Sequence, residues 1–176
     1  MRSRTTDEGA RVLVIGASAG IGAAFAVRAV AGGAEVVVTA RRADRLADTV
    51  AEAGGGHVVV GDLRSEEDCR RMVADAVDVM GGIDLVMYSA GFAPLRSVAD
   101  ADEADLAAVF ETNVFGVQHV LRAAVPQVAP GGIVAVLSSE SVMRPWAGLG
   151  IYASSKAAVE PATRTWPPKL RPYSAE

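Results

Sequence analysis

Val12-Leu13-Val14-Ile15-Gly16-Ala17-Ser18-Ala19-Gly20-Ile21-Gly22 is the stretch of sequence that decides the fold. Its four branched apolar residues predict a short strand in the middle of a parallel sheet. The glycines that follow predict a tight turn, and residues 23–27 continue as a helix. A strand, a glycine-rich turn and a helix form the arrangement that holds a dinucleotide pyrophosphate, because backbone N–H groups and the positive helix N-terminus face the phosphates.

The spacing of these glycines, G-x-x-x-G-x-G, leaves two interpretations open. A glycine-rich turn is also an ordinary tight connection between a strand and a helix in any α/β protein. The turn is therefore interpreted as a nucleotide site only in combination with features found elsewhere in the chain.

The composition limits the classes of protein to which this chain can belong. The chain has 176 residues, of which 51% are hydrophobic and 22% are charged, so it is expected to form one globular domain rather than a disordered segment. The net charge of −4 and the lack of a Lys/Arg cluster argue against a nucleic-acid partner. We find no apolar run that could span a membrane, no signal-peptide core and a single cysteine, Cys69, so a reducing cytoplasm is the predicted location.

Apolar segments alternate with helical ones along the whole chain, which predicts a Rossmann-like, doubly wound parallel sheet with helices on both faces. Strands are expected at 12–15, 35–40, 57–60, 84–88 and 133–137, and helices at 43–53, 65–80 and 102–125, with further helices after Gly22 and from Tyr152. The predicted domain covers 11–160. Residues 1–10 are expected to form a disordered tail, and residues 161–176 an irregular proline-rich tail, in which Pro161 breaks the last helix.

Polar residues that follow two of the strands point to the adenosine end of a dinucleotide. Arg41 and Arg42 come after strand 35–40, where a carboxylate would bind the ribose 2′-hydroxyl of NAD. A guanidinium suits a 2′-phosphate instead, which favours NADP(H), although both arginines could be ordinary surface residues. Asp62 comes after strand 57–60 and can accept a hydrogen bond from the adenine amino group, or it can be a turn residue.

Candidate catalytic residues lie in the second half of the chain. Tyr152 and Lys156 are four residues apart and so share one helix face, where the ammonium favours the phenolate and prepares it to exchange a proton with an alcohol or ketone. Ser139 follows strand 133–137, and its hydroxyl can bind the same substrate oxygen. Asn113 sits in the middle of a predicted helix, where a buried amide needs partners. His57 and His119 have no metal-ligand neighbours at useful spacing, so no metal site is predicted.

This set of motifs, in this order at successive strand ends, resembles the short-chain dehydrogenase/reductase family over about residues 11–165. The resemblance implies hydride transfer between a nicotinamide cofactor, NADP in preference to NAD, and a secondary alcohol/ketone pair. It implies a catalytic tetrad of Asn113, Ser139, Tyr152 and Lys156, and a homodimer or homotetramer. The cofactor-binding residues that it implies are Gly16, Ser18, Ala19, Gly20, Ile21, Gly22, Arg41, Arg42, Asp62, Leu63, Ala90, Gly91, Tyr152 and Lys156.

The chain also departs from the family pattern. Ile15 replaces a threonine, and Tyr88-Ser89 replaces an Asn-Asn pair, which is expected to remove side-chain hydrogen bonds that brace strand 84–88. Family members continue with further strands and a substrate loop, so the chain is interpreted as a C-terminally truncated member whose last strands are missing.

Two alternatives to an active oxidoreductase follow from these departures. One is a catalytically silent module that still binds NADP, and the other is a misassembled fragment that binds nothing. The sequence does not name the substrate. Four apolar residues suggest an apolar pocket wall but fit core or lid packing equally well: Phe92, Met143, Trp146 and Leu149.

Overall fold

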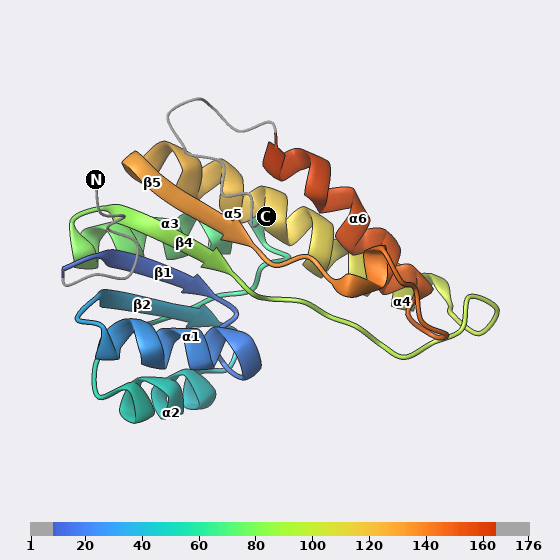
Figure 1. The fold of residues 1–176 in the computed structure, drawn as a ribbon, viewed down its shortest axis with the longest axis horizontal. Coiled ribbons are helices and arrows are strands. Elements are labelled where there is room, and N and C mark those ends of the chain that lie inside the picture. Colours follow the sequence, from blue (N-terminus) through green and yellow to red (C-terminus); the bar gives the residue numbers. More distant parts are fainter. Residues whose placement is uncertain (1–8, 165–176) are drawn as a thin grey trace.

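The computed structural model describes residues 9–164 of the chain. A five-stranded sheet forms its centre, in the order β3-β2-β1-β4-β5, and every neighbouring pair of strands is parallel (Figure 1). The strands are β1 (Arg11–Ile15), β2 (Glu35–Ala40), β3 (His57–Val60), β4 (Ile83–Tyr88) and β5 (Val128–Val136). The predicted strands are confirmed, and β5 begins earlier than predicted.

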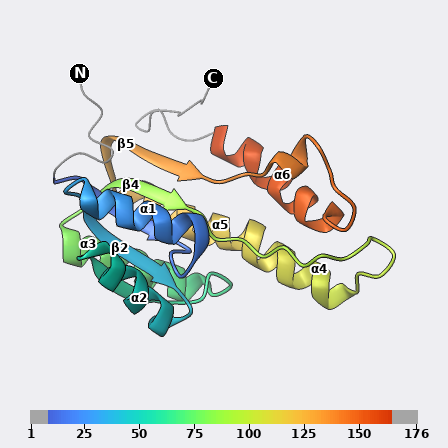
Figure 2. The same ribbon diagram turned by 60° about the horizontal axis from the view of Figure 1, so that its bottom comes forward.

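Helices cover both faces of the sheet, as predicted (Figures 1 and 2). They are α1 (Gly20–Ala31), α2 (Ala43–Ala53), α3 (Glu66–Met80), α4 (Glu103–Phe110), α5 (Gly116–Ala124) and α6 (Gly150–Arg164). One apolar core joins α1 and α2 to the side chains on one face of the sheet, such as Val12 and Val36. The other core joins α3, α5 and α6 to the opposite face, through residues such as Leu13 and Val37. Because β1 and β2 are buried on both faces, they are nearly continuous apolar runs in the sequence.

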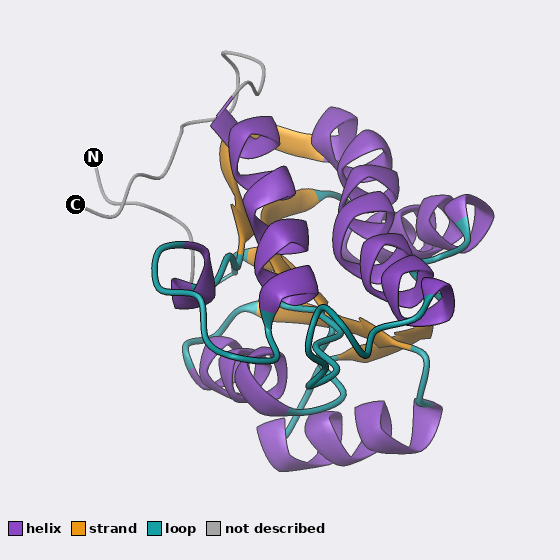
Figure 3. Cartoon of the chain, turned by 90° about the vertical axis from the view of Figure 1, so that its right-hand side faces the viewer, coloured by secondary structure: helices purple, strands orange, loops and turns teal. Residues whose placement is uncertain are grey.

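The centre of the sheet is also where the winding of the chain reverses. Ile15 at the end of β1 pairs with Thr39 of β2 on one side and with Tyr88 of β4 on the other. The loops that leave β1 and β4 therefore run in opposite directions and leave a crevice at the carboxyl ends of the strands. Figure 3 views the molecule from the side at which the strand arrows of Figure 1 end, and loops gather there.

The predicted helix at 102–125 is wrong as a single regular helix. It begins as α4, widens into a π-helical turn at Glu111–Phe115, and resumes as α5. Asn113 lies inside this π-turn and is fully buried. A π-turn adds one residue to the helical repeat, and such turns are frequent at functional sites.

The prediction that Pro161 breaks the last helix is also wrong. The helix α6 continues through Pro161 to Arg164, four residues past the predicted domain boundary at 160. Proline removes one helical N–H donor, and here it does so at an exposed turn, where water can bond the carbonyl that is left over. The rest of the predicted C-terminal tail, and residues 1–8 of the N-terminal one, lie outside the described residues.

Candidate active site

The glycine-rich turn brings the ends of β1 and β4 into contact. Gly16 has a φ of 86°, and a Cβ atom there would lie 2.6 Å from the backbone N and Cα of Ala90. Gly22 lies in the first turn of α1, where a Cβ would collide with Ser89 Oγ and stand 2.5 Å from Gly16 O. Contacts within the chain therefore require glycine at both positions. Gly20 has open space around it, and its φ of 61° is what favours glycine there.

A cavity of about 280 Å³ lies next to this turn, at the carboxyl edge of the sheet. The structure brings together at its wall most of the residues predicted to bind a cofactor: Gly16, Ser18, Ala19, Arg41, Arg42, Asp62, Leu63, Ala90 and Gly91. Residues that were not predicted also line it: Thr39, Ala40, Gly61, Ser89 and Thr112. Four of these five lie at or next to a strand end, a position that could have indicated them from the sequence.

The arginine side of the cavity offers several hydrogen-bond donors. Arg42 Nη2 donates to Ser18 Oγ at 2.9 Å, which joins the loop after β2 to the glycine-rich turn. Arg41 is exposed and lies close to Asp62, whose pKa is held below its usual value mainly by a hydrogen bond from Arg64 and to a smaller extent by the Arg41 charge. Thr39 is fully buried, and its hydroxyl has no hydrogen-bond partner among the described residues. The two arginines make this end of the cavity positive, and the Thr39 hydroxyl makes no hydrogen bond within the described residues.

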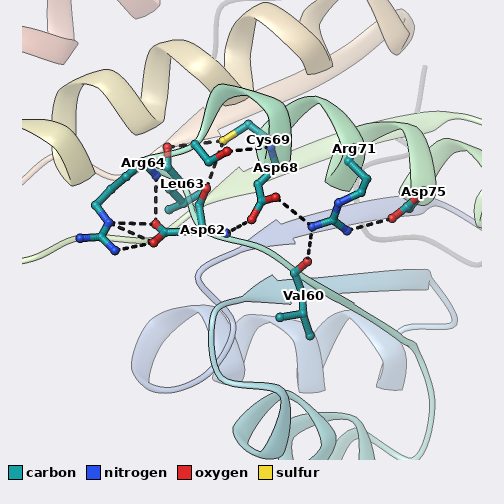
Figure 4. A network of polar contacts seen from close by, with 9 residues as sticks. Val60, Asp62, Leu63, Arg64, Asp68, Cys69, Arg71 and Asp75 are labelled. Carbon is teal, nitrogen blue, oxygen red and sulfur yellow. Dashed lines mark hydrogen bonds and ion pairs between the residues drawn. The ribbon is translucent and has the colours of Figure 1, made fainter.

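Asp62, at the end of β3, is held by its own chain (Figure 4). The Arg64 guanidinium donates to Asp62 Oδ2 at 2.6 Å, and the Arg64 backbone N donates to Asp62 Oδ1 at 3.0 Å. The backbone N of Asp62 donates to Asp68 Oδ2 at 2.9 Å. The hydrogen bond from Arg64 is the main cause that holds the pKa of Asp62 below its usual value. The carboxylate is thus an ionised and oriented acceptor at the cavity wall.

The expected loss of bracing at the end of β4 is not observed. Ser89 Oγ donates to Ile15 O at 2.8 Å, so it ties β4 to β1. The fully buried Tyr88 hydroxyl donates to Thr112 O at 3.2 Å, so it ties β4 to the π-turn. These two residues make hydrogen bonds of their own where the family pattern has an Asn-Asn pair.

Asn113 connects the π-turn to two other segments. Its Oδ1 accepts from Phe92 N at 2.7 Å, and its Nδ2 donates to Phe92 O at 2.9 Å, so the amide pairs with the backbone of the loop after β4. The same Nδ2 donates to Ser155 Oγ on α6 at 2.9 Å. The side chain is therefore engaged at both ends, which is how a fully buried amide becomes stable.

Lys156 and Tyr152 lie on α6 beside these residues. Lys156 is 2% exposed, its Nζ donates to Leu137 O at 2.9 Å, and burial lowers its pKa. Its Nζ lies 5.8 Å from the centre of the Tyr152 ring. A Cβ on Gly91 would lie 3.6 Å from Lys156 Nζ and 3.7 Å from Asn113 Oδ1. The loop after β4 therefore connects the cavity with the predicted catalytic residues in the π-turn and on α6.

Ser139 follows β5 and caps a short 3₁₀ turn, Glu140–Val142. Its Oγ accepts from Ser141 Oγ at 2.8 Å and from Ser141 N at 3.2 Å. Because these bonds use only the acceptor capacity of Ser139, its own hydroxyl hydrogen stays available to a substrate oxygen.

Exposed apolar side chains lie on the loops that follow β4 and β5. Met143 and Trp146 are 83% and 67% exposed, and Phe92 on the opposite loop is 42% exposed. The Arg96 backbone N donates to Gly148 O at 2.9 Å, so the two loops are joined. These side chains are not core residues, whereas Leu149 is partly buried.

The histidines take no part in this site. His119 approaches Leu63 O at 3.2 Å through Nδ1, and His57 is a surface residue that faces Glu35. Among residues 9–164, no cluster of His, Cys, Asp and Glu has the arrangement of a metal site. Within the same residues, none of the helices combines the length and the apolar character that crossing a membrane requires.

A parallel α/β sheet with a glycine-rich crevice at its winding reversal is the arrangement that binds dinucleotides in doubly wound folds. Residues 10–174 match the model of the family described as short chain dehydrogenase. The chain is 34% identical over 166 residues to the glucose 1-dehydrogenase of Gluconobacter oxydans (strain 621H), an alignment that covers 89% of this chain and 62% of that protein.

Two similar solved structures contain a nicotinamide cofactor. A short chain dehydrogenase from Burkholderia cenocepacia J2315 in complex with NADP has a TM-score of 0.84 and 31% identity, with 93% of this chain and 68% of that one covered. A short chain dehydrogenase/reductase from Burkholderia phymatum in complex with NAD has a TM-score of 0.87 and 26% identity, with 94% and 60% covered.

The chain belongs to the short-chain dehydrogenase/reductase family. It spans less than two thirds of the length of the glucose 1-dehydrogenase that it matches. The similar structures hold NADP in one case and NAD in the other, so they support a nicotinamide cofactor without deciding between the two.

Proposed function

We propose that this chain is an NADP(H)-dependent oxidoreductase that interconverts a secondary alcohol and a ketone. The observation that carries the proposal is that the buried Lys156 and the buried Asn113 lie beside Gly91 in the cavity wall, with the Tyr152 ring next to Lys156. A candidate proton donor, Tyr152, is thereby connected through Lys156 to the candidate nucleotide site.

The residues of the cavity fit a dinucleotide. Gly20 has open space where a Cβ would stand, so a pyrophosphate can approach the backbone there, and α1 begins at this residue. The unpartnered hydroxyl of Thr39 and the ionised Asp62 add polar groups at the adenosine end. When bound, the nicotinamide supplies or takes up the hydride.

Preference for NADP(H) is proposed from the charges after β2. Arg41 is exposed at the cavity wall, and Arg42 reaches Ser18 across it. The strand ends in Ala40, so a carboxylate that would bind a 2′-hydroxyl and repel a 2′-phosphate is absent from this strand end. A guanidinium instead offers charge and several donors to a phosphate.

The proton is proposed to move at the hydroxyl of Tyr152. In the direction of ketone reduction, this hydroxyl donates its proton to the oxygen that becomes the alcohol, and the Lys156 ammonium stabilises the phenolate that remains. The free hydrogen of Ser139 binds the same oxygen as charge develops on it. Burial lowers the pKa of Lys156 because it disfavours the charged form. We expect the hydrogen bond from the ammonium to Leu137 O to help hold the charged group in place.

One observation favours the second candidate, an NADP-binding module without turnover. Met143 and Trp146, next to Ser139, are largely exposed. A reactive site excludes water, and an open apolar loop does not. Assembly into a homodimer or homotetramer and a cytoplasmic location stay predictions.

Turnover tests the proposal directly. Oxidation of NADPH would be followed by its absorbance with a panel of apolar ketones and, in reverse, with NADP and the matching alcohols. We expect turnover in the wild type and a loss of roughly a hundredfold or more in Tyr152→Phe, because proton transfer by a positioned side chain contributes about 10²–10⁴-fold. NADPH binding by that variant is the control: it should persist, even if weakened, because the other cofactor-binding residues remain. Cofactor binding without turnover on any substrate would favour the silent module.

A further inference from the structure

A hydroxyl that the proposed chemistry does not use lies in α6 between Tyr152 and Lys156. Ser155 is fully buried. We propose that Ser155 is a positioning residue, which holds the π-turn of Asn113 against α6 and so fixes the rotation of the helix that carries Tyr152 and Lys156. The catalytic part of this inference rests on the proposed function.

The hydrogen bonds of Ser155 have a defined direction. Its Oγ donates to Tyr152 O at 2.7 Å. A hydroxyl has one hydrogen to donate, so Oγ meets the Asn113 amide, 2.9 Å away, as an acceptor. Ser155 thus connects the backbone of Tyr152 to the side chain of Asn113.

Asn113 has little freedom to find another partner. Its Oδ1 and one hydrogen of its Nδ2 are engaged by the backbone of Phe92. Among the described residues, Ser155 takes the second hydrogen. Asn113 is fully buried, so removing that acceptor leaves a buried donor away from water.

The next residue, Lys156, makes a second contact that helps fix the orientation of α6. Lys156 Nζ donates to Leu137 O at the end of β5, while Ser155 binds the π-turn. Consecutive helix residues point about 100° apart, so these two bonds fix the helix in two directions. Loss of the Ser155 bond lets α6 rotate about the contact of Lys156, and Tyr152 moves with it.

The neighbouring Ser154 is a matched control. It lies in the same helix, is exposed, and its Oγ donates to Gly150 O at 2.9 Å. Both serines therefore donate to a carbonyl of α6, and of the two, Ser155 receives the bond from Asn113. Ser154→Ala removes a serine and one bond within the helix without touching the π-turn.

The first test needs neither cofactor nor turnover. Asn113 is the single asparagine of the chain, so labelling with ¹⁵N-asparagine gives one side-chain amide group in an NMR spectrum. We expect Ser155→Ala to shift one of its two hydrogen resonances and to speed the exchange of that hydrogen with water. Ser154→Ala should leave both resonances in place. Unchanged resonances in Ser155→Ala would overturn the inference.

The second test is kinetic. With a carbonyl substrate, Ser155→Ala should lower kcat by roughly ten- to hundredfold, because a small misplacement of a reacting group is enough for such a loss. NADPH affinity should fall by much less than kcat, and Ser154→Ala should retain the wild-type kcat. If Ser155→Ala does not fold, Ser155→Cys keeps the side chain in place with a weaker acceptor and should give a smaller loss of the same kind.

The outcomes separate this inference from the proposed function. A wild type that neither binds NADPH nor turns over a carbonyl contradicts the proposed function, and the NMR comparison still decides the contact of Ser155. A shifted Asn113 amide with an undiminished kcat overturns the positioning role. Equal losses of kcat in the two serine variants overturn it as well.

Discussion

Replacing Gly16 by alanine tests why the turn after β1 contains glycine. The change has two costs. Alanine must adopt the φ of 86° of Gly16, which disfavours an L-residue by about 1–2 kcal/mol. Its Cβ would also lie 2.6 Å from the backbone of Ala90, which cannot rotate aside as a side chain can, and such overpacking costs about 1–3 kcal/mol. We expect the free energy of unfolding to fall by about 2–5 kcal/mol.

Gly54→Ala is the control that separates the two costs. Gly54 has a φ of 72°, and no atom lies within 4 Å of the place where a Cβ would stand. This variant should therefore lose only the first, conformational part. Denaturant unfolding of the wild type and both variants gives the free energies, and the extra loss in Gly16→Ala should be about 1–3 kcal/mol. Equal losses in the two variants would refute the close approach of β1 and β4.

Four further expectations concern three side chains. Tyr88→Phe should lower the free energy of unfolding by about 1 kcal/mol, measured in denaturant, because it removes the bond to Thr112 O. Burial raises the pKa of the Cys69 thiol to about 12, so native Cys69 should resist iodoacetamide at alkaline pH, as mass spectrometry can show. Because the thiolate forms first in the unfolded chain, stability should fall as pH rises from about 9 toward 12, and Cys69→Ala should flatten that fall. Ser141→Ala should lower kcat with unchanged NADPH affinity in a titration, because it removes the hydroxyl that donates to Ser139.

The sheet could be predicted from the sequence because its central strands are buried on both faces. Val12–Ile15 is a continuous apolar run that ends at a glycine, and no other local pattern competes with it. The glycine-rich turn and the polar residues at two strand ends, Arg41, Arg42 and Asp62, then indicated part of the cavity wall, because parallel strands bring their carboxyl ends to one edge. The family resemblance supplied the other lining residues that were predicted.

The π-turn could not be predicted from apolar periodicity. The apolar residues across the π-turn follow one another at three or four residues, as in a regular helix: Leu106, Phe110, Val114, Val117 and Leu121. The signal that was present was Asn113 itself, a polar residue at a buried position of a helix. Its partners, Phe92 and Ser155, lie 21 and 42 residues away in the chain, so no local pattern could reveal them.

Predictions made from local sequence rules were also wrong at positions where the surrounding structure determines the outcome. Pro161 costs one helical bond, but at an exposed turn that loss did not end α6. The exchange of an Asn-Asn pair for Tyr88 and Ser89 indicated lost hydrogen bonds. Both side chains reach carbonyl groups on neighbouring segments, which depends on geometry that the sequence does not contain.

The most direct test of the central claim is a titration of the chain with NADPH and NADH. We expect NADPH to bind more tightly by about tenfold or more, because a hydrogen bond to a charged group contributes about 1.5–3 kcal/mol. Arg41→Ala should remove most of that preference, while Arg45→Ala, an exposed arginine of α2 that is paired only loosely with Asp48, should keep it. Binding of neither dinucleotide, or a preference that survives in Arg41→Ala, would contradict the account.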